Sequence, residues 1–280
     1  MFKKKIGVLL ASTMLVGALA VGCSSNSGGS GDSGDSSKVS VSGSTSIGPL
    51  METIGEKFQE KNQGVSVEVQ QIGSSGGIKN AIEGTSEIGM SSRDLKDEEK
   101  SAGLKETKIA IDGIALITNT ANSVKNLTMD QVKGIYTGKI TNWKEVGGND
   151  APIVIVSREE GSGTRDGFQE IVGFDSEELT KDAQISDGSG NIKTTVEGNE
   201  NAIGYISFGY VDEKVNSLKI NDVEATDANV IANKYPISRP FLLVTKGDAT
   251  GDAKSFIDYV LSDEGQKTIE KEGFMSVNQK

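Results

Sequence analysis

Short apolar stretches that alternate with polar ones set the pattern of this chain. Residues 39–41 and 65–70 place apolar and polar side chains in turn, which is the period of a strand with one buried face. Leu50, Ile54 and Phe58 recur at helical spacing between these two segments. The sequence therefore predicts a strand, a helix and a second strand at the start of the folded part.

The same order of strands and helices continues to the C-terminus. Further strands are predicted at residues 87–90, 109–118, 152–156, 202–208 and 241–244, and further helices after 73–77, 128 and 159–164 and around 256–261 and 266–271. This alternation is typical of an α/β fold, and 280 residues are enough for two lobes. The apolar stretch 109–118 is long enough to cross from one lobe to the other, and 241–244 could cross back.

The first 22 residues have the pattern of a signal peptide. Three lysines precede the apolar stretch 6–21, which is shorter than the roughly 20 residues that a membrane span needs. Small residues then lead to Cys23, as in a bacterial lipobox, so Cys23 is predicted to be the lipidated N-terminus; a buried thiol is the alternative. Residues 24–37 contain only Ser, Gly, Asp and Asn, so 23–38 is expected to be a tether without structure of its own.

The overall composition excludes several kinds of chemistry. The chain has no His and one Cys, so a Ser-His-Asp triad, a Cys-His pair, a zinc site with imidazole and an internal disulfide are all excluded. Its formal net charge is -11, which argues against nucleic acid as the main partner. Removal of the signal peptide takes away three Lys and no acid, leaving 26 basic and 40 acidic residues and a net charge of -14.

Three turns that follow predicted strands are rich in Ser, Thr and Gly and lead into helices. Their candidate donors are Thr45 and Ser46 in the first turn, Ser74 in the second, and Ser162, Gly163 and Thr164 in the third. The N-terminus of a helix presents free N–H groups to an anion, and the ends of parallel strands are where open α/β sheets bind ligands. Ordinary helix capping is the alternative for each turn taken singly.

Charged residues next to the third turn favour an oxyanion that still holds a proton. Arg158 could donate two hydrogen bonds to the oxygens of an anion, although a surface ion pair with Glu159 is the alternative. Glu159 and Glu160 could accept a hydrogen bond from a P–OH group, and would disfavour fully ionised sulfate. Both could also be solvated loop acids.

Five motifs, taken together and in order, resemble the phosphate-binding lipoproteins of bacterial ABC transporters. They are GSTSIGP at 43–49, GSSGG at 73–77, IGMSSR at 88–93, IYTGKITNW at 135–143 and REEGSGT at 158–164. The resemblance implies a periplasmic-binding-protein-like fold of the type II class, with phosphate bound between two α/β lobes. It also implies delivery to a membrane permease that is driven by an ATPase, and it implies no cofactor.

The resemblance also implies which residues bind phosphate. The donors of the family correspond to Thr45, Ser46, Ser74, Arg158, Ser162, Gly163 and Thr164, and its acceptor after the arginine corresponds to Glu160. A second family acceptor, an Asp, corresponds to Ser92, which is followed by Arg93. Proton sensing would then depend on Glu160, and Arg93 could add positive charge or could pair with Asp94 or Glu98.

The resemblance and the crossing strands together predict the division of the chain into lobes. Lobe 1 is expected to comprise residues 39–115 and 236–280, and lobe 2 residues 116–235, with hinges at 109–118 and 236–244. The leading hypothesis is an extracytoplasmic phosphate receptor without enzymatic activity, anchored to the cell membrane by lipid as in Gram-positive bacteria. The alternatives are a receptor for sulfate, molybdate or tungstate, an enzyme with a serine nucleophile, and an adhesin or sensor.

Overall fold

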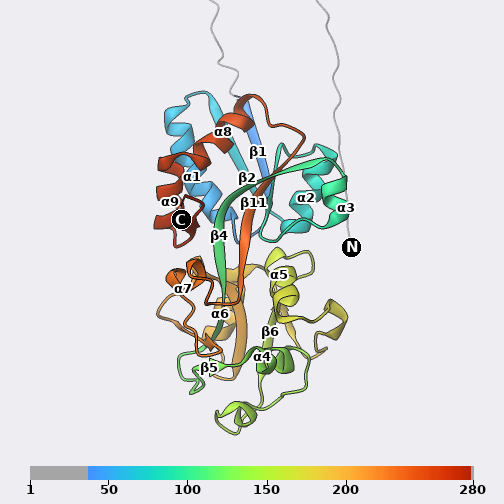
Figure 1. The fold of residues 1–280 in the computed structure, drawn as a ribbon, viewed down its shortest axis with the longest axis vertical. Coiled ribbons are helices and arrows are strands. Elements are labelled where there is room, and N and C mark those ends of the chain that lie inside the picture. Colours follow the sequence, from blue (N-terminus) through green and yellow to red (C-terminus); the bar gives the residue numbers. More distant parts are fainter. Residues whose placement is uncertain (1–36, 279–280) are drawn as a thin grey trace, which may run out of the picture. The chain divides into compact units, whose positions relative to one another are not determined.

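The computed structural model describes residues 37–278, which form two α/β lobes joined by two long strands (Figure 1). The predicted signal peptide at 1–22, the lipidation site Cys23 and nearly all of the predicted tether lie outside the described residues. Within residues 37–278, no helix combines the length and the apolar character that crossing a membrane requires.

The first lobe is built around three parallel strands. Strand β1 (Ser37–Gly43) pairs in parallel with both β2 (Val65–Gln71) and β3 (Ile88–Ser91). The helices of this lobe are α1 (Gly48–Lys61), α2 (Ser74–Glu83), α3 (Asp97–Ser101), α8 (Gly251–Leu261) and α9 (Asp263–Lys271). Leu50, Ile54 and Phe58 of α1 are buried in the core, as their helical spacing predicts.

The second lobe repeats this plan with different elements. Strand β6 (Val154–Arg158) pairs in parallel with β7 (Gln184–Ser186) and with β8 (Ala202–Ser207). Its helices are α4 (Met129–Tyr136), α5 (Gly163–Val172), α6 (Gly188–Glu197) and α7 (Asp227–Ile231). Short strands complete it at β5 (Asn126–Leu127), β9 (Val215–Ser217) and β10 (Lys219–Ile220).

Strands β4 (Leu104–Asn119) and β11 (Ser238–Lys246) run through both lobes as an antiparallel pair (Figure 1). Strand β4 pairs with β11 and with β12 (Met275–Ser276) at one end and with β8 at the other. Strand β4 contributes to two separate hydrophobic cores. Ile109 and Ala110 pack in the core of the first lobe, and Ile114 and Leu116 pack in a core of the second. The lobe bounds and the hinges predicted from the sequence remain predictions.

The prediction of a two-lobed α/β fold is confirmed. The strand predicted at 109–118 is longer than expected, and the strand predicted at 152–156 begins two residues later, at Val154. Thr128 caps α4 as expected, since its hydroxyl accepts a hydrogen bond from the backbone N–H of Gln131. Helix α6 was not predicted, because its sequence GSGNIKTTVE has little apolar periodicity.

Candidate anion-binding site

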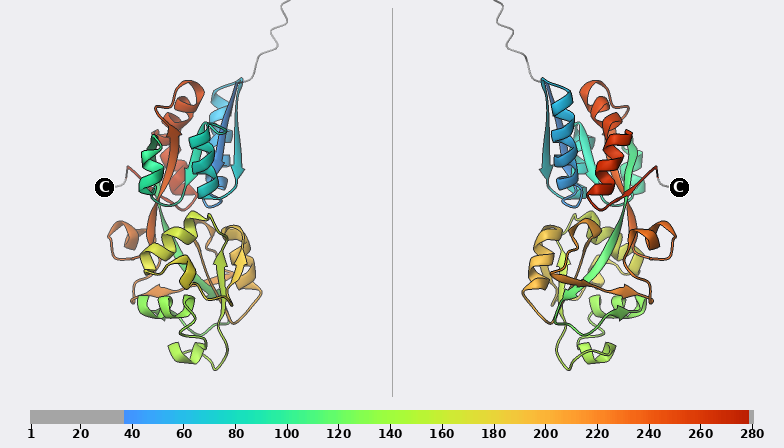
Figure 2. Two further views of the ribbon diagram at one scale, coloured as in Figure 1. Left: turned by 90° about the vertical axis from the view of Figure 1, so that its right-hand side faces the viewer. Right: turned by 90° about the vertical axis from the view of Figure 1, so that its left-hand side faces the viewer.

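The loops that follow the parallel strands of the two lobes meet each other. Strands β1, β2 and β3 end at Gly43, Gln71 and Ser91, and β6 ends at Arg158. Since parallel strands end at one edge of a sheet, each lobe presents its Ser- and Gly-rich turns at one edge. The two edges come together where the lobes touch (Figure 2), and Ser75 N–H of the first lobe donates to the Gly161 carbonyl of the second, at 3.1 Å.

Arg158 lies at the centre of this junction, with a side chain that is 1% exposed. Its Nη2 donates to Thr45 Oγ1 of the first lobe at 2.7 Å, and its Nη1 donates to Thr164 Oγ1 of the second at 3.1 Å. The backbone at this point is fixed by Tyr205, whose hydroxyl accepts from Arg158 N–H at 3.1 Å and pairs with the Ser157 hydroxyl at 2.8 Å. Arg158 therefore presents a charged donor to hydroxyl groups of both lobes.

Buried hydroxyl groups surround the guanidinium group. Ser46 Oγ and Thr164 Oγ1 lie 2.8 Å apart across the lobe junction. In the first lobe Ser44 donates to Ser92 Oγ at 2.9 Å, and Ser92 Oγ lies 3.3 Å from Ser74 Oγ. The five hydroxyl groups belong to side chains that are buried, so each needs a partner inside the protein or on a ligand.

The N-terminus of α5 completes the junction. Ser162 caps the helix by accepting a hydrogen bond from Arg165 N–H at 3.3 Å. Gly163 has no room for a side chain, since an added Cβ would lie 2.2 Å from Ser74 Oγ and 2.8 Å from Ser92 Oγ. The glycine lets the first turn of α5, with its free N–H groups and the positive end of its dipole, approach the hydroxyl groups of the other lobe.

The carboxylate that pairs with Arg158 is Glu159 and not Glu160. Glu159 accepts from Arg158 Nε and Nη2, both at 2.7 Å, and from Gly188 N–H at 3.2 Å. Burial alone would raise the pKa of Glu159, but the hydrogen bonds and charge of Arg158 lower it overall. The Glu160 residue is exposed, so the prediction of Glu160 as the proton acceptor in the site is not supported: the turn directs the neighbouring carboxylate to the arginine.

Arg93 forms ion pairs with two carboxylates. Its Nη1 and Nη2 donate to the two oxygens of Glu99, each at 2.8 Å, and its Nε donates to Asp166 of α5 at 2.9 Å. These partners differ from Asp94 and Glu98, which were expected as alternatives, although Nη1 also donates to the backbone carbonyl of Asp94. Arg93 therefore links the lobes, and each of its three guanidinium nitrogens already donates to a carboxylate.

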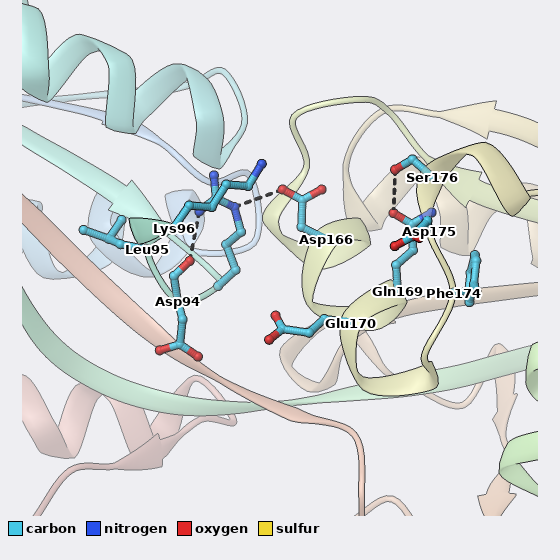
Figure 3. A pocket seen from close by; sticks show the side chains of 10 residues that line it. Asp94, Leu95, Lys96, Asp166, Gln169, Glu170, Phe174, Asp175 and Ser176 are labelled. Atoms are coloured by element: carbon cyan, nitrogen blue, oxygen red, sulfur yellow. Dashed lines mark hydrogen bonds and ion pairs between the residues drawn. The ribbon is translucent and has the colours of Figure 1, made fainter. Parts of the chain in front are cut away.

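A groove of about 420 Å³ lies beside this ion pair (Figure 3). Asp166 and Glu170 of α5 form one side of it, and Asp94 and Lys96 of the first lobe lie across from them. The groove has both charge signs on its walls, unlike the hydroxyl-lined junction at Arg158.

Two buried residues of the junction were not predicted from the sequence. Ser189, in the first turn of α6, is 1% exposed and accepts a hydrogen bond from Arg158 Nη1 at 3.4 Å. The turn at Gly188 follows β7 and leads into α6, so it repeats the pattern of the three predicted turns and could have been found by the same signal. Arg239 of β11 donates to Ser46 Oγ at 3.3 Å, and no local motif marks it.

No group of three or more His, Cys, Asp or Glu side chains in the described part of the chain could hold a metal ion. The groups that meet at the junction are hydroxyl groups, guanidinium groups and helix N-termini, together with the Glu159 carboxylate on Arg158. Such a set can bind an oxyanion by hydrogen bonds.

Comparison with known proteins agrees with this chemistry. Residues 28–264 match the family described as PBP superfamily domain. The chain is also 38% identical over 239 residues to the phosphate-binding protein PstS of Bacillus subtilis, a match that covers 84% of this chain and 78% of that protein. The chain belongs to the family of phosphate-binding proteins within the PBP superfamily. A second phosphate-binding protein PstS, of Borreliella burgdorferi, is 30% identical over 250 residues, which cover 85% of this chain and 90% of that protein.

Solved structures of similar proteins have the same fold. A phosphate ABC transporter substrate-binding protein of Clostridium perfringens, solved with bound phosphate, is 65% identical and superimposes with a TM-score of 0.85, covering 86% of this chain and all of that one. An ABC-type phosphate transport receptor of Vibrio cholerae is 36% identical with a TM-score of 0.75, over 86% of this chain and 100% of its own.

Proposed function

We propose that this protein captures inorganic phosphate between its two lobes and delivers it to an ABC importer. The main support is the buried Arg158, whose two terminal nitrogens donate to hydroxyl groups from opposite lobes. Relatives described as phosphate-binding proteins support the identity of the anion. Delivery to a permease and its ATPase rests on the family alone.

The proposed phosphate-binding residues come from both lobes. They are Thr45, Ser46, Ser74 and Ser92 of the first lobe and Arg158, Ser162, Gly163 and Thr164 of the second. An anion held by both groups would favour contact between the lobes, because it would bind the closed arrangement better than the open one. Glu160 and Arg93 are left out of the proposed contacts, for the reasons given above.

We propose binding without catalysis. A serine nucleophile needs a neighbouring base, and the chain has no His. The hydroxyl groups near Arg158 bond to one another and to arginine, so within the described residues no base is paired with Ser46, Ser74 or Ser92. A test for hydrolysis of nitrophenyl phosphate is expected to give no product.

Titration calorimetry on protein stripped of ligand tests the proposal. Phosphate is expected to bind at micromolar concentration or below, and Arg158→Ala is expected to weaken binding by about 2–5 kcal/mol, because it removes one partner of a buried charge pair. Lys193→Gln is the control, since Lys193 pairs with Asp212 away from the site. Absence of phosphate binding by the unaltered protein would exclude the function, and an unchanged affinity in Arg158→Ala would exclude the site.

A receptor for another tetrahedral oxyanion is the second candidate, and one observation favours it. Ser92 stands where an acidic acceptor was expected, the Glu160 residue is exposed, and Glu159 is the carboxylate that pairs with Arg158. With fewer acceptors the site would discriminate less against sulfate. Competition of sulfate, molybdate and tungstate with phosphate distinguishes the two candidates.

We further propose that the mature protein begins at a lipidated Cys23 and is held on the outer face of the cell membrane. The signal pattern of residues 1–22 supports this. Labelling of growing cells with palmitate is expected to mark the protein, and Cys23→Ala is expected to lose the label. Retention of the label by Cys23→Ala would exclude this anchor.

A further inference from the structure

Arg239 is a buried cation on one of the two strands that join the lobes. It lies on β11 directly opposite Asp112 on β4, and its Nε and Nη2 both donate to Asp112 Oδ2, at 3.1 and 2.9 Å. The side chain of Arg239 is 2% exposed, and that of Asp112 is fully buried. A buried pair of this kind needs further hydrogen bonds to be tolerated.

The hydrogen bonds of Asp112 are complete. Its second oxygen, Oδ1, accepts from the Ser207 hydroxyl at 2.8 Å and from Phe208 N–H at 3.2 Å, both in the second lobe. Asp112 is therefore fixed by two elements of the second lobe and holds Arg239 in one orientation.

Two hydroxyl groups connect Arg239 to Arg158. Arg239 Nη2 donates to Ser46 Oγ at 3.3 Å, Ser46 Oγ lies 2.8 Å from Thr164 Oγ1, and Thr164 Oγ1 accepts from Arg158 Nη1 at 3.1 Å. Ser46 and Thr164 thus lie between two guanidinium groups. These are two of the hydroxyl groups proposed to bind phosphate.

The third nitrogen of the Arg239 guanidinium group, Nη1, is buried and has no hydrogen-bond acceptor among the described residues. Burial lowers the pKa of Arg239, and the positive charge of Arg158 lowers it further. The charge and hydrogen bonds of Asp112 raise it, but the pKa is lowered overall. Two cations that repel each other across shared hydroxyl groups, one with an unused donor, are a favourable place for an anion.

We propose that Arg239 is a second cationic residue of the phosphate site, which binds the doubly charged anion together with Arg158 from the strands that join the lobes. This inference rests on the proposed phosphate-binding function. Because Arg239 belongs to β11, it would connect the bound anion to the predicted hinge at 236–244. Arg239 would then supply the additional positive charge that was one of the two alternatives for Arg93.

Two variants separate binding from folding. Arg239→Lys keeps the charge and loses the planar fork, whereas the double variant Asp112→Asn with Arg239→Gln removes both charges and leaves no unpaired ion in the core. Thermal unfolding without phosphate reports whether each variant folds. Lys193→Gln is again the control, because it removes a cation of the second lobe that does not contact the site.

Calorimetry with phosphate is expected to show a loss of affinity of about tenfold or more in the double variant and a smaller loss in Arg239→Lys. The loss should be greater at about pH 8 than at about pH 5.5, because the dianion interacts more strongly with a cation than the monoanion does. A residue with only a structural role would weaken both forms equally.

The outcomes distinguish the inference from the function on which it rests. If the unaltered protein binds no phosphate, the proposed function fails. If the unaltered protein binds phosphate and a folded double variant binds it within about twofold, or loses affinity equally at both pH values, the role of Arg239 is excluded and the function stands.

Discussion

At the scale of single residues, the two adjacent glutamates after Arg158 have different surroundings. Glu159 forms two hydrogen bonds with Arg158 and accepts a third from the N-terminus of α6. The Glu160 residue is exposed on the same turn. The carboxylate that orients the central arginine is therefore the one directly after it in the chain.

Replacement of these two residues by glutamine is expected to have unequal effects. Glu159→Gln should weaken phosphate binding by about tenfold, because Arg158 loses the carboxylate that holds its orientation, whereas Glu160→Gln should change it by less than about twofold. Calorimetry on the two variants checks this, and equal effects would contradict the assignment.

Acidification provides a second measurement on Glu159. Since its pKa is lowered on folding, its pairing with Arg158 stabilises the native state above the ordinary pKa of 4.5 and is lost as the pH falls through the lower folded value. The difference in melting temperature between the unaltered protein and Glu159→Gln should therefore be present at neutral pH and should shrink as the solution is acidified below pH 4.5. A difference that grows on acidification would contradict the lowered pKa.

At the scale of elements, helix α5 approaches the first lobe closely because it begins with glycine. A methyl group at Gly163 would overlap Ser74 Oγ, which belongs to the opposite lobe. Gly167, one turn later in the same helix, has its nearest neighbour 3.7 Å from an added Cβ, which is ordinary contact. Both glycines are therefore helical, but only Gly167 has room for a methyl group.

Gly163→Ala is expected to weaken phosphate binding by at least about a hundredfold, because the lobes cannot approach each other. Gly167→Ala should leave binding within about threefold of the unaltered protein. Gly167→Ala should keep or slightly raise the melting temperature measured without phosphate, since alanine favours a helix and the site has room for a methyl group. The same measurement on Gly163→Ala shows whether that variant still folds. Equal affinity in the two variants would contradict the close contact between the lobes.

The ion pair between Arg93 and Asp166 connects the turn after β3 to α5 and hence one lobe to the other. Arg93 is held in place by Glu99 of its own lobe, so of its two ion pairs only the one with Asp166 joins the lobes. Asp166 is partly exposed, with 27% of its side chain accessible, so the expected contribution is modest.

Asp166→Asn is expected to raise the dissociation rate of phosphate by about three- to tenfold, because the closed arrangement loses an ion pair. Asp212→Asn is the matched control, since Asp212 pairs with Lys193 inside the second lobe. The ratio of affinities for phosphate and sulfate should stay unchanged in both variants, because neither side chain contacts the proposed anion. A change in that ratio for Asp166→Asn would instead favour a direct role for Arg93.

At the scale of the whole molecule, the net charge and the proposed ligand have the same sign. The full chain has a formal charge of -11. An anion is therefore repelled at long range, and affinity has to come from short hydrogen bonds inside the site.

The association rate of phosphate is expected to rise with ionic strength. Salt shortens the Debye length from about 30 Å at 0.01 M to about 3 Å at 1 M, so it screens the repulsion between the chain and the anion. Stopped-flow measurements over this range should show an increase of about two- to tenfold in the association rate and little change in the dissociation rate. A decrease would indicate that a local positive field guides the anion.

Hydrophobic periodicity predicted most of the long elements, because it reports which face of each segment is buried. It placed β1, α1, β2 and the crossing strand β4 close to their observed positions. It missed α6, a helix whose buried side chains include Ser189 and which is stabilised mainly by packing on β6 and β8. Hydrophobic periodicity predicts a helix poorly where tertiary packing supplies most of the stability of that helix.

The sequence by itself determined the α/β fold, the absence of histidine chemistry and the Ser- and Gly-rich turns at the ends of the strands. These follow from composition and from the order of residues along single segments. Only the tertiary structure decided that Glu159 rather than Glu160 holds Arg158, that Arg93 pairs with Glu99 and Asp166, and that Arg239 reaches Ser46. Ser46 and Arg239 are 193 positions apart, and their contact depends on how β11 crosses between the lobes, which no local pattern encodes.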